Sequence, residues 1–407
     1  MAFINKRLLS RKTKTVLKAL SVLILCNILV IWYMGFHAAH KQVLLKEGEI
    51  HLKERTVVDI EIYKLNETGP PIYMGKDFSE FIHRMNANYK RAFSYSASDK
   101  VSGAKNVDIK NDYYPFVDFK FVLPDVAPTI NISQSYAMIV LVNSGAKGNK
   151  FRKRREAIRQ TWGNQSNCEQ RKASQDERLK HLRWLLVFVV GKAGSRTNDD
   201  ELNIAEARQH NDMLIGNITD NYINNVIKFY MGQVWASRFD VKYTMKTDDD
   251  VYVRIPRVLE YLVHAKFPRP FYGGATYPSI RVDRSIGGKW AVSWKYYNKT
   301  HFPRFNPGAF FILSSDLLNR LWNYTCVRKP FHTDDAYVGV AMQDFKVNIT
   351  KMHSFRAIPR MPQFIRSVKD CEMMNCTAFG DAVDPQSARQ LHRRLQSHSC
   401  SNITMKC

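Results

Sequence analysis

The stretch Val241–Val253 reads VKYTMKTDDDVYV and determines how the rest of the chain is interpreted. Its first half alternates apolar and polar residues, and this period of two, with β-branched and aromatic members, predicts a strand. The carboxylates Asp248, Asp249 and Asp250 follow that strand directly. Because adjacent like charges repel one another, such a triplet either faces water fully or binds a cation.

The place of the triplet favours a ligand site. In open α/β sheets, ligands bind outside the carboxyl ends of the strands, and the triplet stands at such an end, between two apolar runs. Clustered carboxylate oxygens suit Mg²⁺ or Mn²⁺ shared with a pyrophosphate. We therefore interpret the triplet as a site for a metal and a nucleotide, with a solvated acidic turn as the alternative.

The composition indicates a globular, basic protein. The chain has 407 residues, of which 45% are hydrophobic and 12% aromatic, and this excludes a disordered protein. Its length fits one large or two modest domains with appendages. The formal net charge of +24 attracts anionic ligands. Nucleic acid is one such class of ligand, and the compartment indicated by the N-terminus argues against it.

The N-terminus has the layout of a membrane anchor. Residues 1–18 carry six Lys and Arg and no acid, and residues 19–36 form an apolar run of eighteen residues broken only by Ser21 and Asn27. As a helix the run is roughly 27 Å long, enough for a thin bilayer. The positive-inside rule keeps the basic end cytosolic. We expect a single-pass type II membrane protein with a cytosolic tail, a transmembrane signal anchor and a luminal remainder; a cleaved secretory signal is the alternative.

Two further features agree with a luminal body. Nine Asn-x-Ser/Thr sequons follow the apolar run and none precedes it, so they are candidate N-glycosylation sites. They are Asn66, Asn131, Asn164, Asn217, Asn298, Asn323, Asn348, Asn375 and Asn402. Six cysteines also follow the run, an even number that permits three disulfides in pairings that the sequence leaves open. Zinc is disfavoured because the chain has no C-x₂-C pair and no HExxH motif.

Behind the anchor we expect a polar luminal stem, residues 37–130, and a luminal catalytic domain, residues 131–407. The stem shows no sustained periodicity. In the domain, apolar strand patterns alternate with helical ones, which predicts βαβ units. The fold class is therefore α/β, with a Rossmann-like, mostly parallel sheet flanked by helices. Predicted strands cover 136–142, 184–190 and 308–313, besides the one before the triplet; predicted helices cover 199–210, 222–239, 256–265 and 315–322.

Five motifs occur in a fixed order along this domain. They are RREAIRQTWG (154–163), VFVVG (187–191), KTDDDVYV (246–253), FNPGAFFILS (305–314) and TDDAYVG (333–339). The set resembles the β-1,3-galactosyltransferase and β-1,3-N-acetylglucosaminyltransferase family, whose pattern is RxxIRxTWG, F-x-x-G, K-x-DDD, G-x-G-Y and E-D-V-Y-x-G. The resemblance covers roughly residues 136–355, more than half of the chain. It implies a GT-A-type fold and a type II protein of the Golgi membrane.

The resemblance also implies an inverting transfer from a UDP-sugar to a glycan acceptor on protein or lipid. The leaving UDP needs a divalent cation, Mn²⁺ or another, to stabilise its charge. By this comparison Asp250 is the direct metal ligand, Asp248 faces the ribose or a metal-bound water, and Asp249 faces the sugar. A purely structural role is the alternative for Asp249. His353 stands where family members often carry a histidine that completes the metal site, although a lone histidine is more commonly unrelated to metal.

The resemblance places the catalytic base at Asp335, which would take the proton of the acceptor hydroxyl. The motif departs from the family here, since Asp334 replaces the usual Glu and Ala336 the usual Val. Asp334 and Gly308 are expected to line the acceptor pocket, where G-A-F-F replaces G-x-G-Y and leaves the identity of the acceptor open. The alternative is that the two acids cap a helix that follows them.

Arg155 and Arg159 lie four residues apart on one predicted helix face. We expect them to meet the pyrophosphate or uracil of the nucleotide-sugar. The alternative for each is a solvated basic face or salt bridges within the fold.

The predicted function is therefore a β-1,3-galactosyltransferase that uses UDP-galactose. The alternatives are transfer of N-acetylglucosamine or N-acetylgalactosamine, and a catalytically silent luminal sugar-binding protein. A luminal nucleotide-diphosphate hydrolase is disfavoured, because the aromatic stretch Trp290–Phe311 suits a sugar-stacking surface. The sequence does not decide the oligomeric state.

Overall fold

The structure is a computed structural model that describes residues 78–94, 114–352, 355–357 and 361–400. All of these belong to one compact unit, Val57–Cys407. Within these ranges no helix is both long and apolar enough to cross a bilayer. The expected anchor, residues 19–36, lies outside them, and so do the cytosolic tail and the first part of the stem.

The described residues form a large central sheet of eight strands. Its order is β1 (Pro124–Val126), β4 (Met213–Thr219), β3 (Trp184–Lys192), β2 (Ser135–Asn143), β5 (Asp240–Asp248), β8 (Phe310–Ser314), β7 (Tyr272–Gly274) and β9 (Ile349–Lys351). The four central strands, β4, β3, β2 and β5, run parallel to one another. The sequence predicts β2 and β3 as continuous apolar runs and β5 as an alternating strand, but it does not predict β4 as a strand.

The strands on either side of this centre include antiparallel pairings, although β9 pairs parallel with β7. Strand β8 pairs antiparallel with β5, β7 pairs antiparallel with β8, and β1 pairs antiparallel with β4. The sheet is therefore mixed, with a parallel centre. The direction of β8 was not readable from its sequence, because all five of its residues are buried and the strand has no polar face.

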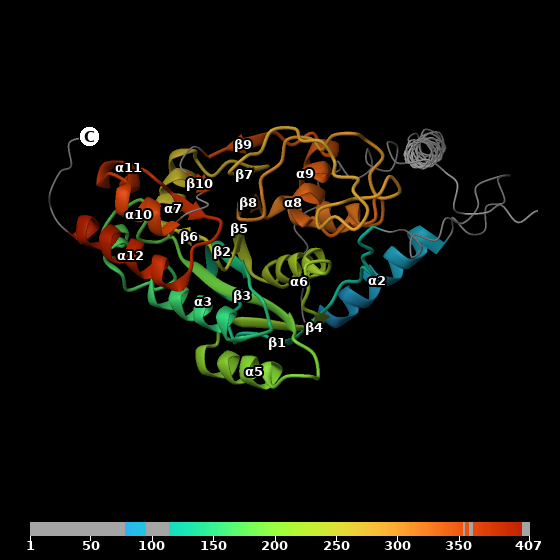
Figure 1. Ribbon diagram of the computed structural model, residues 1–407, viewed down its shortest axis with the longest axis horizontal. Helices are drawn as coiled ribbons and strands as arrows, with labels where there is room; N and C mark the ends of the chain where they lie inside the picture. Colours follow the sequence, from blue (N-terminus) through green and yellow to red (C-terminus); the bar gives the residue numbers. More distant parts are fainter. Residues whose placement is uncertain (1–77, 95–113, 353–354, 358–360, 401–407) are drawn as a thin grey trace, which may run out of the picture. The chain divides into compact units, whose positions relative to one another are not determined.

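Helices cover both faces of the sheet (Figure 1). One face packs against α2 (Phe78–Ser94), α6 (Asn225–Ala236), α8 (Asp316–Tyr324) and α9 (Asp334–Asp344). The other packs against α3 (Asn149–Gln160), α5 (Asp199–His210), α7 (Ile255–His264), α10 (Met361–Ser367) and α12 (Pro385–Cys400). The predicted helix 199–210 matches α5 residue for residue. The helices predicted at 222–239, 256–265 and 315–322 correspond to α6, α7 and α8 with shifted ends.

Part of the segment expected to form a stem packs on the domain. Helix α2 buries Phe78, Phe81, Ile82 and Met85, a spacing that places them on one helix face. The side chain of Asn86 both donates to and accepts from the backbone of Phe121, at 2.9 and 2.8 Å. The division of the chain at residue 130 stays a prediction.

A second, three-stranded sheet lies beside the acidic triplet. Its order is β10 (Phe355–Ala357), β11 (Ala378–Gly380) and β6 (Tyr252–Val253). Strand β11 pairs antiparallel with β6, which directly follows the triplet. A disulfide between Cys168, at the start of α4 (Cys168–Ala173), and Cys400 joins the end of α12 to the rest of the unit. The disulfide thereby ties the end of α12 to α4, while the pairing of β11 with β6 brings the chain before α12 close to the triplet.

Candidate active site

The acidic triplet stands at the carboxyl edge of the parallel strands, as the sequence predicts. Strand β5 ends at Asp248, and Asp248 pairs in register with Asn143, the last residue of β2. The turn after β5 holds the other two carboxylates. Because β2 and β5 run parallel, the turn that follows β2 lies directly beside the triplet.

The three carboxylates have different surroundings. Asp249 is buried, and its side chain accepts hydrogen bonds from Ser144 Oγ at 2.7 Å and from Arg154 at 2.8 Å. The side chains of Asp248 and Asp250 are 35% and 26% exposed. Protein groups thus hold Asp249 in place, which agrees with a structural role for it, while the other two carboxylates remain open to a ligand.

Burial and repulsion from neighbouring carboxylates raise the pKa of Asp249 and of Asp250. Burial raises the pKa of Asp250 to about 6; the Arg154 charge lowers it, and the charges of Asp248 and Asp249 raise it further. Arg154 lies 3.3 Å from Asp250. A divalent cation would relieve this repulsion, so the chemistry of the donors fits one. In the described ranges no three His, Cys, Asp or Glu side chains make a complete metal site, and a cation would need further oxygen donors from a pyrophosphate or water.

A buried lysine links the triplet to the second acidic motif. Nζ of Lys246 lies 2.9 Å from a carboxylate oxygen of Asp248, donates to the carbonyl of Gly308 at 2.7 Å, and lies 3.8 Å from Asp334. A Cβ atom on Gly308 would lie 2.5 Å from Nζ, so a side chain there would displace the ammonium. Glycine at this position therefore allows the lysine to approach both motifs.

Asp334 and Asp335 occupy the first turn of α9. Thr333 takes the N-cap position, so the capping role considered for the two acids is not the one observed. The two carboxylate oxygens of Asp335 accept from the backbone N–H of Gly308 at 3.0 Å and of Ala336 at 2.8 Å. Burial raises the pKa of Asp335, and the Lys246 charge opposes that shift. Asp335 is half-buried, so its carboxylate can still receive a proton from a ligand.

Asp334 faces a small cavity on the inner side of the site. Among the described residues, no hydrogen bond involves Oδ2 of Asp334, Oδ1 of Asn143 or either amide atom of Gln233. All three residues line one cavity of about 10 Å³, measured as the volume open to the centre of a water molecule. That is about the space one water needs, and the unpaired polar atoms give it partners.

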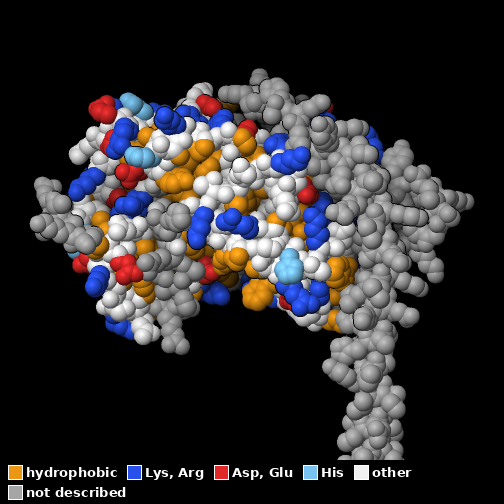
Figure 2. All heavy atoms as spheres, turned by 90° about the horizontal axis from the view of Figure 1, so that it is seen from above, with side chains coloured by type: hydrophobic (Ala, Val, Ile, Leu, Met, Phe, Trp, Pro, Cys, Tyr) orange, Lys and Arg blue, Asp and Glu red, His pale blue; other side chains and the backbone are white. Residues whose placement is uncertain are grey.

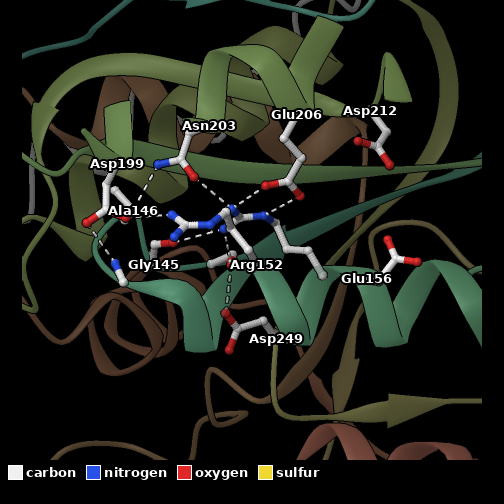
Figure 3. Close-up of polar contacts among 12 residues, drawn as sticks. Gly145, Ala146, Arg152, Glu156, Asp199, Asn203, Glu206, Asp212 and Asp249 are labelled. Atoms are coloured by element: carbon white, nitrogen blue, oxygen red, sulfur yellow. Dashed lines mark hydrogen bonds and ion pairs between the residues drawn. The ribbon is translucent and has the colours of Figure 1, made fainter. Parts of the chain in front are cut away.

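The two arginines predicted to contact the nucleotide are bonded to protein groups. Arg155 is fully buried and bonds to Glu206 through two nitrogens, at 2.9 and 2.6 Å, to Asn203 at 2.8 Å, and to Ser144 and Gly145 at 3.1 and 2.9 Å. Figure 3 shows Asn203 and Glu206 of α5 pointing into this network.

Arg159 makes a similar set of contacts. It bonds to Glu206 at 2.7 Å and to both oxygens of Asp212 at 2.7 and 2.9 Å. The contacts of both arginines match the alternative of salt bridges within the fold, and nucleotide binding by them stays a prediction. Through Ser144, which bonds to both Arg155 and Asp249, the network supports the triplet from behind.

Three charged residues near the triplet were missed in the sequence. Lys246 shares a strand face with Asp248, since the two are two residues apart, and this spacing was a usable signal. Arg154 adjoins the arginines that helical spacing selected. Asp381 had no local signal: the pairing of β11 with β6 brings it close, and Val383, two residues on, donates to the carbonyl of Asp250 at 2.9 Å. Burial and then the charge of Asp248 raise the pKa of Asp381.

Some predicted residues lie outside the described ranges, namely His353, Asn66 and Asn402. The other seven sequon asparagines are exposed or half-buried, and none is buried: Asn131, Asn164, Asn217, Asn298, Asn323, Asn348 and Asn375. Their glycosylation stays a prediction.

Comparison with known proteins agrees with this site. The family model described as Galactosyltransferase matches residues 153–353, which include the triplet and the acid pair. Over these residues the chain carries a galactosyltransferase-family domain. It is a hexosyltransferase, similar to the β-1,3-galactosyltransferases. The family match ends before Asp381 and α12, so the C-terminal side of the site lies beyond it.

Individual relatives are distant. Beta-1,3-galactosyltransferase brn of Drosophila melanogaster is 28% identical over 67% of this chain and 79% of its own length. Human beta-1,3-galactosyltransferase 5 is 26% identical over 53% of this chain and 66% of its own. A solved mannosyltransferase of Pyrobaculum calidifontis, in complex with GDP-mannose and Mn²⁺, is 11% identical over 79% of this chain and 84% of its own, with a TM-score of 0.28. A likeness that low supports no conclusion on fold or ligand.

Proposed function

We propose that this protein is an inverting β-1,3-galactosyltransferase that moves galactose from UDP-galactose to a hydroxyl of a glycan on protein or lipid. We further propose a GT-A-type fold carried by a type II signal anchor, with the catalytic domain in the Golgi lumen. The observation that carries the proposal is the meeting of Asp248 and the Asp334–Asp335 pair around Lys246. This arrangement brings the proposed base, Asp335, close to the triplet that would hold the leaving UDP.

In this mechanism Asp248 and Asp250 would hold Mn²⁺ or another divalent cation, which when bound neutralises the charge that develops on the leaving UDP. Arg154 adds a positive charge next to Asp249 and Asp250. Asp335 accepts the proton of the acceptor hydroxyl. In the same step the oxygen of that hydroxyl forms a bond to the anomeric carbon, and the bond from this carbon to UDP breaks. Attack from the side opposite UDP inverts the anomeric carbon.

The protein keeps Asp335 oriented for this step. Its carboxylate is held by the backbone N–H groups of Gly308 and Ala336, which fixes the plane of the side chain. The buried ammonium of Lys246 favours the ionised carboxylate, the form that acts as a base. A base must be within hydrogen-bond reach of the hydroxyl it deprotonates, and the half-buried position of Asp335 leaves that approach open.

The test uses the full chain in detergent micelles with Mn²⁺ and three donors: UDP-galactose, UDP-N-acetylglucosamine and UDP-N-acetylgalactosamine. UDP release is measured with and without simple galactosides, N-acetylhexosaminides and xylosides, and the product is analysed by NMR. We expect acceptor-dependent release from UDP-galactose, loss of activity with EDTA, and a β-1,3 linkage. UDP release from only one of the N-acetylated donors would show that this donor, and not UDP-galactose, is the substrate. UDP binding without release from any donor would favour the silent sugar-binding protein.

A further inference from the structure

The chain between β7 and β8 carries an exposed aromatic and basic tip close to the base. This excursion, residues 275–309, closes on itself through bridges between Tyr277 and Phe305 and between Arg281 and His301. Near its turn the indole of Trp290 is 59% exposed, although most large aromatic side chains of the domain are buried. An exposed indole beside a reacting centre is a common means of binding sugar, because its flat face packs on the C–H face of a pyranose ring.

His332 fixes this tip to the segment that carries the base. His332 is buried, and its Nε2 bonds to the carbonyl of Lys289 at 2.9 Å. A carbonyl only accepts, so Nε2 carries the hydrogen; burial lowers the pKa of His332 and keeps the ring neutral. Asp335 follows His332 by three residues in the sequence. The tip and the base are therefore held in one relative position.

Tyr222 completes the aromatic surface. Its ring meets the edge of the His332 ring at a centroid distance of 5.8 Å. Burial raises the pKa of the Tyr222 hydroxyl, and the charges of Asp335 and Asp334 raise it further, as expected for a phenol beside the acid pair. The Tyr222 and Trp290 rings both lie within 5.3 Å of Nζ of Lys289, measured to the ring centres. The two rings thus lie together next to the proposed base.

The ammonium of Lys289 stands over these rings without an acidic partner. Its Nζ lies 4.5 Å from the centre of the Tyr222 ring and 5.3 Å from the centre of the Trp290 ring. In the part of the chain that the structure describes, no carboxylate lies within ion-pair distance of it. The protein as a whole is basic, with a formal net charge of +24, and Figure 2 shows Lys and Arg side chains among apolar ones across the middle of one face. An anionic ligand group is the natural partner for such a cation.

We propose that Trp290, Tyr222 and Lys289 form an acceptor subsite for an acidic sugar, with the pyranose ring on the indole and its anionic group on the lysine. This proposal rests on the proposed glycosyl transfer and names the class of acceptor. The anionic group is the carboxylate of a uronic acid or the sulfate of a sulfated sugar, and both present charged oxygens to one ammonium.

The test compares matched acceptors that differ in the charged group alone. The full chain in detergent is assayed with phenyl β-glucuronoside against phenyl β-glucoside, and with a 6-sulfated galactoside against the plain galactoside. We expect the KM of at least one acidic acceptor to be about 2–5-fold below that of its neutral partner, as one partly exposed charge pair provides. Which pair shows the difference distinguishes carboxylate from sulfate.

Variants separate the two contacts. Lys289→Met should raise the KM of the acidic acceptor to that of the neutral one and leave the donor KM unchanged, while Lys289→Arg should retain the preference. Lys299→Met, which removes an exposed charge from the same excursion, is the control for general attraction. Trp290→Ala should raise the KM of every acceptor, since it removes the stacking surface. Equal KM values for acidic and neutral partners would overturn the acidic class, and an unchanged acceptor KM in Trp290→Ala would overturn the subsite.

Failure of the proposed function is visible separately, as a wild-type protein that releases no UDP with any acceptor. In that case calorimetric titration of the same phenyl glycosides still tests the subsite. Tighter binding of the acidic member, lost in Lys289→Met and kept in Lys299→Met, supports it. Equal binding of both members, or no binding of either, contradicts it.

Discussion

Replacing Arg155 by Met distinguishes a supporting arginine from one that binds the nucleotide. The guanidinium is fully buried, and its contacts tie α3 to the turn after β2 and to Glu206 of α5. Met has a similar length but no charge, so the substitution leaves these acceptors unpaired without creating a large cavity. We expect the domain to lose stability, while the residues that face the ligand keep their positions closely enough to bind.

The size of the loss follows from the partners left behind. Breaking a buried ion pair by removing one member costs about 3–5 kcal/mol, because the other charge stays buried. Glu206 keeps a second partner in Arg159, at 2.7 Å, and its side chain is 11% exposed, so the lower end applies. We expect the free energy of unfolding to fall by about 3 kcal/mol. The measurement is urea unfolding followed by far-UV circular dichroism, with exposed Lys153→Met on the same helix as the control.

UDP affinity in the presence of Mn²⁺ is measured on the same variant under conditions where it remains folded. Arg155 reaches the triplet only through Ser144, so we expect a change of less than about fivefold, or roughly 1 kcal/mol. A variant that unfolds like the wild type but binds UDP more than about tenfold more weakly would refute this reasoning. Such a result would mean that Arg155 binds the nucleotide, as the sequence predicts.

Three further changes test other parts of the site. Gly308→Ala should push the Lys246 ammonium out of place and lower kcat, since a Cβ would lie 2.5 Å from Nζ; an unchanged kcat would contradict this. Without divalent cation, the free energy of unfolding of the wild type, measured by urea titration, should fall by about 1–2 kcal/mol relative to that of Asp250→Asn as the pH rises from 4 to 6. The sign follows because the folded carboxyl, with a pKa of about 6 against an ordinary 3.8, keeps its proton longer than the unfolded one. Mn²⁺ should restore that loss above pH 6, and a gain over the same interval without cation would contradict the assignment. A high-resolution crystal structure should show one ordered water between Gln233 and Asp334, absent in Gln233→Leu, and an empty cavity in the wild type would contradict the polar role of that space.

The parallel centre of the fold could be predicted because its signals are local. Strands β2 and β3 are continuous apolar runs and α5 has clear ends, so each element is specified by its own residues. The antiparallel pairings were not predictable, since the direction of β8 depends on where the excursion before it returns the chain. The second sheet was missed because strands of two or three residues have no periodicity. Helix α2 carried a usable signal in the spacing of its buried side chains.

The site was predictable to a similar degree. The triplet and the acid pair belong to short motifs, so their residues could be named directly. The partners of Arg155 could not, because helical spacing shows which residues share a face but not what that face meets; Glu206 comes from a helix 51 residues further along the chain. Asp381 reaches the site through strand pairing between distant segments, and no local pattern announces such a contact.

The role of Asp335 is tested most directly by the substitution Asp335→Asn, which keeps the shape of the side chain and removes its basicity. Acceptor-dependent UDP release and UDP affinity with Mn²⁺ are measured on the same preparation. We predict that kcat falls by about 10²–10⁴-fold, the usual contribution of a general base, while UDP affinity stays unchanged. A variant that retains kcat within about tenfold of the wild type would show that Asp335 is not the base.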